Sequence, residues 1–316
     1  MKNEILSLSN IKKFRSDADI KNGCAVAVGS FDGVHLGHQK MIKNLVAAAK
    51  EIGRNAVVFT FDFDDNPKSG AKALASLSQK ETLLENLGVD ILVSSPFSKI
   101  KNFSATDFVD FLYEALGART VICGYDFRFG KDRLGDAEFI KARLSPLGVE
   151  VITPNAVCVD EKPVSSTLIR NLLSEGEIVR VNKLLDREFS IVGEVVHGAR
   201  LARKLGFPTA NVVYPKNLSL LHFGVYATRV MVDGNVYEAI TNVGVKPTVA
   251  NGDEILCESY LFDYNEEIYG KAIEVSFVEF IRPEQKFASV DELRSQVERD
   301  KISVLKLFRE GAFDKQ

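Results

Sequence analysis

Residues 24–38 read CAVAVGSFDGVHLGH, and this stretch predicts a buried strand that runs into a glycine-rich turn. The small and β-branched apolar residues at 24–29 are typical of a strand that is covered on both faces. A pattern of helical period follows at residues 38–52. Between the two, Gly29, Gly33 and Gly37 permit a tight backbone that can approach a ligand closely. The stretch therefore predicts a strand, a binding turn and a helix in succession.

The same alternation of strand and helix continues through the first half of the chain. Further strands are predicted at residues 55–61, 89–93, 119–123 and 149–153, and helices at 79–87, 106–116 and 137–147. This alternation requires crossover connections, so it predicts an α/β fold with a mostly parallel sheet that helices cover on both faces. Ligands of such sheets bind at the carboxyl ends of the strands. Two short helices are predicted next, at residues 167–174 and 177–185.

The pattern changes after about residue 186. Apolar runs with partial two-residue alternation lie at 190–196, 225–232, 236–243, 255–262 and 272–280. Turn residues at 233–235 and 251–253 separate some of these runs, as antiparallel hairpins require. We therefore predict a small antiparallel β-barrel, with a terminal helix at 290–309 packed on its outside. The predicted domains are residues 1–185 and residues 186–316.

Composition and charge exclude several classes of protein. With 46% hydrophobic and 26% charged residues in 316 positions, the chain is typical of globular proteins and unlike disordered, collagen-like or coiled-coil ones. The 40 basic and 43 acidic residues provide no positive excess for a nucleic-acid partner. No apolar run approaches the roughly 18 residues of a membrane span, and the first residues lack the pattern of a signal peptide. We expect a cytoplasmic protein with no membrane partner; the sequence does not predict its oligomeric state.

The cysteines are too far apart in the sequence to indicate a zinc site or a disulfide framework. They are Cys24, Cys123, Cys158 and Cys257.

The first candidate site consists of two histidines at the predicted start of a helix. His35 and His38 are three residues apart, so they share one helix face, next to backbone N–H groups at the positive end of the helix dipole. Their imidazoles could donate hydrogen bonds to charge that develops on phosphoryl oxygens and on a leaving pyrophosphate. From the spacing alone, a metal site and a pair of ordinary polar loop residues are alternatives.

With its glycines and its Phe31-Asp32 pair, the segment 29–38 resembles the signature of the FMN adenylyltransferase module in the bacterial bifunctional riboflavin kinase/FAD synthetase family. That module is related to the HxGH nucleotidyltransferases. Residues 124–130 (GYDFRFG) and 165–170 (SSTLIR) match two further motifs of the family in order and spacing. In the family the first approaches ATP and flavin, and the second resembles a phosphate-binding loop. Taken alone, residues 165–170 would indicate an ordinary helix N-cap followed by an exposed arginine.

The second half resembles the riboflavin kinase module of the same family, through residues 193–198 (GEVVHG) and 203–211 (RKLGFPTAN). Pro208 keeps Phe207 extended, and in an extended chain Thr209 and Asn211 point the same way. A hydroxyl and an amide carbonyl are suitable oxygen ligands for Mg²⁺, and in the family these two positions serve Mg-ATP. Taken alone, the segment would indicate an ordinary turn. Glu258 matches the proposed catalytic base of the family, although most glutamates on strands are simply exposed.

The resemblance implies two reactions. Riboflavin and ATP would give FMN and ADP in the barrel, and FMN and ATP would give FAD and pyrophosphate in the α/β domain. It implies that His35, His38 and Arg170 stabilise adenylyl transfer, that Glu258 is the base of the kinase, and that Mg²⁺ accompanies ATP. Residues implied in nucleotide or flavin binding are Gly29, Phe31, Asp32, Gly33, Gly37, Gly124, Asp126, Phe127, Ser165, Ser166, Thr167, Gly193, His197, Gly198, Arg203, Gly206, Phe207, Pro208 and Asn242.

The chain departs from the family pattern after its second predicted strand. The family usually continues Thr-Phe-Asp-Pro-His-Pro, whereas residues 60–65 read TFDFDD, so two prolines and an imidazole are replaced. This departure motivates one alternative, a riboflavin kinase with an impaired adenylyltransferase half. A non-catalytic flavin- or nucleotide-binding regulator is a second alternative. Retention of Glu258 and both histidines counts against it, because binding alone does not require them.

Overall fold

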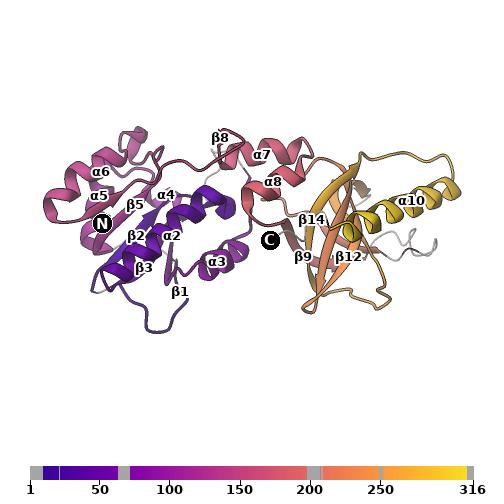
Figure 1. Ribbon diagram of the computed structural model, residues 1–316, viewed down its shortest axis with the longest axis horizontal. Helices are drawn as coiled ribbons and strands as arrows, with labels where there is room; N and C mark the ends of the chain where they lie inside the picture. The colour runs from indigo at the N-terminus through magenta and orange to yellow at the C-terminus, as the bar shows by residue number, and fades with distance from the viewer. Residues whose placement is uncertain are drawn as a thin grey trace. The chain divides into compact units, whose positions relative to one another are not determined.

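The computed structural model describes residues 10–20, 22–62, 72–197, 207, 209–248 and 252–311 (Figure 1). By its internal contacts the chain divides into two compact units, Met1–Ser166 and Thr167–Gln316. The first is built on a mostly parallel sheet and the second on a closed antiparallel barrel. Both predicted fold classes are confirmed.

The first unit contains a six-stranded sheet with the strand order β1-β4-β3-β2-β5-β6. Its strands are β1 (Asn10–Lys13), β2 (Cys24–Val28), β3 (Asn55–Asp62), β4 (Ile91–Pro96), β5 (Ala118–Cys123) and β6 (Glu150–Ile152). The strands from β2 to β6 pair in parallel, as the alternation predicts. The edge strand β1 pairs antiparallel with β4 and was not predicted. All four of its residues are exposed, so it lacks the apolar alternation by which strands are recognised.

Helices cover both faces of this sheet. They are α2 (Leu36–Glu51), α3 (Leu77–Asn86), α4 (Phe97–Ile100), α5 (Ala105–Asp110), the π-helical turn η2 (Phe111–Ala115) and α6 (Ala137–Leu144). On one face Ala25 and Ala27 of β2 pack with buried side chains of α2 and α3. On the other face Val26 and Val28 pack with a phenylalanine-rich core from α5, η2 and α6. The alternation of alanine and valine in β2 therefore matches two helical layers, with the smaller residues beneath α2.

Short elements complete the first unit. They are the 3-10 turns η1 (Asp32–Val34), η3 (Lys131–Arg133) and η4 (Ser145–Leu147), and the strands β7 (Cys158–Val159) and β8 (Lys162–Pro163).

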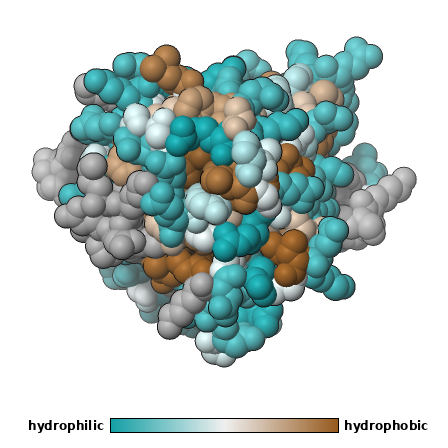
Figure 2. Space-filling model, turned by 90° about the vertical axis from the view of Figure 1, so that its left-hand side faces the viewer, coloured by the Kyte–Doolittle hydropathy of each residue, from teal (hydrophilic) through white to brown (hydrophobic). Residues whose placement is uncertain are grey.

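In the space-filling view of Figure 2, hydrophilic residues dominate the face shown, and hydrophobic ones form separate small patches. Single exposed apolar residues are ordinary on protein surfaces.

The second unit is a closed barrel with the strand order β10-β13-β12-β11-β14-β9. Its elements are α7 (Ser166–Ser174), α8 (Ile178–Leu185), β9 (Phe189–Val196), β10 (Thr209–Val213), β11 (Gly224–Val232), β12 (Asn235–Thr248), β13 (Gly252–Leu261), β14 (Ala272–Arg282) and α10 (Val290–Arg309). Contacts group α8 with the barrel, because Asn182 donates to the carbonyl of Phe277 and accepts from the backbone of Phe189 at 2.8 Å each. The functional boundary near residue 186 stays a prediction.

The two faces of the barrel strands differ in what they contact. Inward-facing hydroxyls of Thr228, Thr241 and Ser259 form a chain of hydrogen bonds of 2.7 and 2.8 Å. Outward-facing Val225 and Ala227 belong to a core that α10 completes. The terminal helix thus packs on the outside of the barrel, as predicted.

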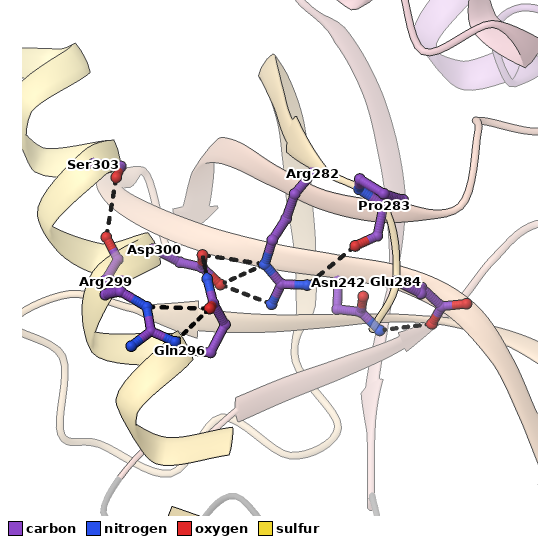
Figure 3. A network of polar contacts seen from close by, with 8 residues as sticks. All are labelled: Asn242, Arg282, Pro283, Glu284, Gln296, Arg299, Asp300 and Ser303. Carbon is purple, nitrogen blue, oxygen red and sulfur yellow. Dashed lines mark hydrogen bonds and ion pairs between the residues drawn. The ribbon is translucent and has the colours of Figure 1, made fainter. Parts of the chain in front are cut away.

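An ion pair between Arg282 at the end of β14 and Asp300 of α10 joins the helix to the barrel (Figure 3). Arg282 donates through Nε and Nη2 to both carboxylate oxygens of Asp300, at 2.8 to 3.1 Å. Gln296 donates to the same carboxylate at 2.8 Å, and Asp300 is only 4% exposed. The carboxylate is therefore fully engaged at the helix–barrel interface.

Asp300→Ala is expected to lower the free energy of unfolding of the second unit by about 3 kcal/mol, because it leaves a half-buried guanidinium without its partner. Chemical unfolding followed by circular dichroism measures this loss. Lys306→Ala is the control, since its 3.7 Å pair with Glu310 is exposed and should contribute less than about 0.5 kcal/mol. Equal effects of the two substitutions would contradict the prediction.

Candidate active sites

The two motifs of the first unit meet at the carboxyl edge of its sheet. Val28, the last residue of β2, is paired in register with Cys123, the last residue of β5. The turn that begins at Gly29 and the loop that begins at Gly124 therefore leave neighbouring strands at the same level. The strand order also reverses here, with β3 and β4 on one side of β2 and β5 and β6 on the other. Ligands of open α/β sheets bind at such a point.

The turn after β2 has an unusual backbone. Phe31 (φ 47°) and Val34 (φ 43°) are left-handed although neither is glycine, and both are buried. Gly33 also has a positive φ, of 74°. Non-glycine residues adopt this conformation only where the surrounding structure holds them in it, and they cluster at functional sites.

Asp32 is central to holding this turn. Its carboxylate accepts a hydrogen bond from the backbone N–H of Leu74 at 2.8 Å, and its carbonyl accepts from the hydroxyl of Ser166 at 3.1 Å. Asp32 is 2% exposed. These contacts indicate that buried Asp32 stabilises the conformation of the turn. They also place Ser166 of the predicted phosphate loop next to Asp32.

The two histidines stack against each other at the start of α2. Their ring centroids are 3.7 Å apart with an interplanar angle of 17°. His35 caps the helix, because its Nδ1 accepts from the backbone N–H of His38 at 3.4 Å. An accepting Nδ1 places the proton of neutral His35 on Nε2. A Cβ at Gly37 would lie 3.1 Å from Cε1 of His35, so glycine lets the ring lie close to the backbone.

Burial, the neighbouring His35 and the ammonium of Lys80 all lower the pKa of His38, to well below the usual value of 6.5. The imidazole of His38 is therefore neutral at physiological pH. Its Nδ1 is buried and has no hydrogen-bond partner among the described residues. A neutral ring of this kind offers one donor and one acceptor to a ligand.

The remaining predicted residues of this half are partly placed. Asp126 is exposed, and its Oδ1 would lie 3.1 Å from a Cβ at Gly124, so the carboxylate folds back over that glycine. Phe127 is half-buried and its ring stacks on that of Phe129, with the ring centroids 5.4 Å apart. Thr167 and Arg170 lie on α7, in the second unit. The altered segment at residues 63–65 lies outside the described residues.

The kinase motifs of the second unit come together on the outward face of the barrel. Asn211 of β10 is opposite Glu258 of β13, and Glu258 is opposite Asn242 of β12. Directly opposed residues on antiparallel strands share a face, so these three side chains form one row. Thr209 lies on the same face, opposite Tyr260. The prediction that Thr209 and Asn211 point the same way is confirmed.

Asn211 has an unsatisfied oxygen within this row. Its amide nitrogen donates to the carbonyl of Thr209 at 3.2 Å and to the hydroxyl at 3.4 Å. Its Oδ1 is buried and has no donor among the described residues, and the side chain is only 4% exposed. An acceptor left in this state costs about 1–3 kcal/mol, so a ligand that supplies positive charge would offset that cost.

Side chains from the β14–α10 connection and from α10 border the row. Glu284 accepts a hydrogen bond from Asn242 at 3.3 Å (Figure 3) and packs against Gly244. The Nζ of Lys301 lies 5.5 Å from the ring centroid of Tyr260. The ring of Tyr260 makes an edge-to-face contact with that of Phe207, with their centroids 5.3 Å apart. Sequence reasoning gave Glu284 and Lys301 no role, because only the fold brings them to the row.

The other predicted kinase residues are placed in part. Gly193 lies in β9, where an added Cβ would collide with Val212, so close strand packing accounts for the glycine. His197 lies against the ring of Tyr269 at 4.0 Å. Gly198, Arg203, Gly206 and Pro208 lie outside the described residues. Among the residues described, no cluster of three His, Cys, Asp or Glu side chains could hold a metal ion.

Comparisons with known proteins identify the family of each half of the chain. A family model described as FAD synthetase matches residues 17–168, and one described as riboflavin kinase matches residues 185–308. The chain belongs to the bifunctional riboflavin kinase/FMN adenylyltransferase family. Among curated relatives with this name, the protein of Haemophilus influenzae is 34% identical over 89% of this chain and 93% of its own length. The protein of Escherichia coli is 34% identical over 91% of this chain and 94% of its own.

A solved structure supports the fold over most of the chain. A crystal structure from Streptococcus pneumoniae, described as a macrolide-efflux protein, is similar with a TM-score of 0.82 and 30% identity. The match covers 93% of this chain and 97% of that one. In the part of this chain that the structure describes, no helix is long and apolar enough to cross a membrane.

Family membership establishes both reactions and their order along the chain. The FAD synthetase module is N-terminal and makes FAD from FMN, and the riboflavin kinase module is C-terminal and makes FMN from riboflavin. Both are ATP-dependent transferase reactions, so riboflavin, FMN and ATP are the substrates of the family.

Proposed function

We propose that the row Asn211–Glu258–Asn242, together with Thr209, forms the riboflavin kinase site. The observation that supports this most directly is the register, which aligns Glu258 between two amide side chains on one face. In the proposed reaction the ribityl 5′-hydroxyl gives its proton to Glu258 while its oxygen attacks the γ-phosphorus of ATP. The bond from that phosphorus to the β-phosphate oxygen breaks, and ADP leaves.

Thr209 and Asn211 would hold Mg²⁺ in this site. The unsatisfied Oδ1 of Asn211 and the adjacent hydroxyl of Thr209 are the oxygen ligands that Mg²⁺ prefers, and such sites take their remaining ligands from water and phosphate. The bound ion would neutralise charge on the transferred phosphoryl group. Asn211 and Thr209 then act by fixing the place of the triphosphate relative to Glu258.

The first unit is proposed to transfer the adenylyl group at the histidine pair. An FMN phosphate oxygen attacks the α-phosphorus of ATP, and the bond to the β-phosphate oxygen breaks to release pyrophosphate. Neutral His35 and His38 donate hydrogen bonds to the phosphoryl oxygens and the leaving group as negative charge develops on them. The hydroxyl of Ser166, beside the same turn, is proposed to bind a further phosphate oxygen, and the roles of Thr167 and Arg170 stay predictions. Ser165 is proposed to assist Ser166.

A time course with purified protein, riboflavin, ATP and Mg²⁺ tests both halves at once. Chromatography should show FMN first and FAD after it, and excess EDTA should abolish both products. FMN without FAD would favour the alternative in which residues 63–65 impair the adenylyltransferase half. Absence of both products would favour a binding protein.

Asn211→Ala tests the proposed metal ligand separately. It should raise the Mg²⁺ concentration for half-maximal kinase rate at least about tenfold. Substitution of a group that only hydrogen-bonds to a metal ligand already weakens metal affinity by about 10–100-fold. The Mg²⁺ dependence of FAD formation from supplied FMN serves as the control and should not change. An unchanged requirement in the kinase reaction would remove Asn211 from the metal site. The cytoplasmic location and the domain limits at residue 186 stay predictions.

A further inference from the structure

A buried lysine lies behind the turn that carries the histidine pair. Lys80, on α3, is only 7% exposed, whereas lysines are almost never fully buried unless they are paired. Its Nζ donates a hydrogen bond to the carbonyl oxygen of Ser30 at 3.3 Å. Ser30 directly precedes Phe31, the first left-handed residue of the turn. The ammonium therefore acts on the backbone where the strained conformation begins.

The same carbonyl accepts a second hydrogen bond from a neighbouring strand. Thr60 of β3, which is completely buried, donates its hydroxyl to the Ser30 oxygen at 3.0 Å. Two donors, from a helix and from a strand, thus fix one carbonyl of the turn. This is the kind of support that keeps a left-handed non-glycine residue in place.

Lys80 also acts on His38 through its charge. Burial lowers the pKa of His38 most, and the ionisable groups that lower it further are His35, at the start of the same helix, and Lys80, from α3. A fixed positive charge in a buried place is poorly screened by solvent, so it stabilises negative charge that develops nearby. Lys80 lies four positions before buried Leu84, and thus on the buried face of the helix.

We propose that Lys80 is a positioning residue for adenylyl transfer, which holds the turn between β2 and α2 in shape and supplies a buried positive charge that acts on His38. The proposal rests on the proposed role of the histidine pair. Lys80 acts through the turn and the histidine and is not itself assigned a contact with substrate.

Lys80→Met, Lys80→Arg and the control Lys43→Met test the proposal in the full-length enzyme. Lys43 lies on α2 and is exposed. With FMN and Mg-ATP, Lys80→Met should lower kcat for FAD formation about 10–100-fold with a much smaller change in KM. Lys80→Arg should recover most of that loss, because it keeps the charge. Lys43→Met should match the parent, and riboflavin phosphorylation should stay unchanged in all three.

Histidine NMR supplies a readout that a merely structural lysine would not move. The chain has only four histidines, so the ring signals of His38 can be assigned and titrated. In folded Lys80→Met the pKa of His38 should rise, while burial and His35 still hold it below its ordinary value, and in Lys80→Arg it should not rise. An unchanged rate of FAD formation in Lys80→Met would overturn the proposal. Loss of the folded histidine spectrum in both Lys80 variants would also overturn it, because Lys80 would then serve only stability.

His38→Ala separates this proposal from the one on which it rests. If His38→Ala makes FAD at the parent rate, the histidine site itself is wrong. If His38→Ala is inactive while Lys80→Met is fully active, only the role of Lys80 is wrong.

Discussion

Glu258→Gln should lower kcat for FMN formation from riboflavin by about 10²–10⁴-fold, because the amide cannot accept the proton of the ribityl hydroxyl. The substitution keeps the length and the shape of the side chain. The row formed with Asn211 and Asn242 should therefore stay in place, and KM should change little. Steady-state kinetics with riboflavin and Mg-ATP measure both constants.

The bifunctional chain contains its own control for this variant. FAD formation from supplied FMN should be unaffected, because the adenylyltransferase module lies in the other half of the chain. Glu254→Gln is the matched substitution on the same strand and should leave both activities intact. Loss of both activities in Glu258→Gln would contradict the assignment of the two reactions to separate modules. A kinase rate within a few-fold of the parent would show that Glu258 is not the base.

His38→Ala should have the opposite effect, and lower FAD formation from FMN by about 10²–10³-fold, the usual cost of removing one preorganised donor to developing charge. The loss should appear mainly in kcat, since the hydrogen bond strengthens as charge develops in the transition state. Riboflavin phosphorylation on the same chain should continue, so FMN should accumulate as the end product. Chromatographic separation of the flavins detects this change directly.

Lys40→Ala is the matched control for His38, since Lys40 is exposed on the same helix. It should leave FAD formation unchanged. If His38→Ala produced FAD at the parent rate, His38 would have no part in the reaction. If the kinase rate fell along with FAD formation, the effect would come from a general loss of folded protein.

The elements that the sequence predicted well are those with strong local patterns. The buried run of β2 and the helical period of α2 locate both elements, although α2 begins at Leu36 because His35 is its N-cap. The edge strand β1 was missed because its exposed residues carry no apolar pattern. The strand β10 is absent from the predicted strands, yet its pairing with β13 and β9 closes the barrel.

The sequence by itself determined the two fold classes, their order along the chain and the motifs on which the two proposed sites rest. Strand and helix periods are local, and motif spacing is read directly along the chain. Only the tertiary structure decided which distant residues meet. The pairing register aligned Asn211, Glu258 and Asn242 in one row, and the packing of α3 buried Lys80 behind the turn at Ser30. These placements depend on long-range pairing and on burial in the core, which a pattern of neighbouring residues does not encode.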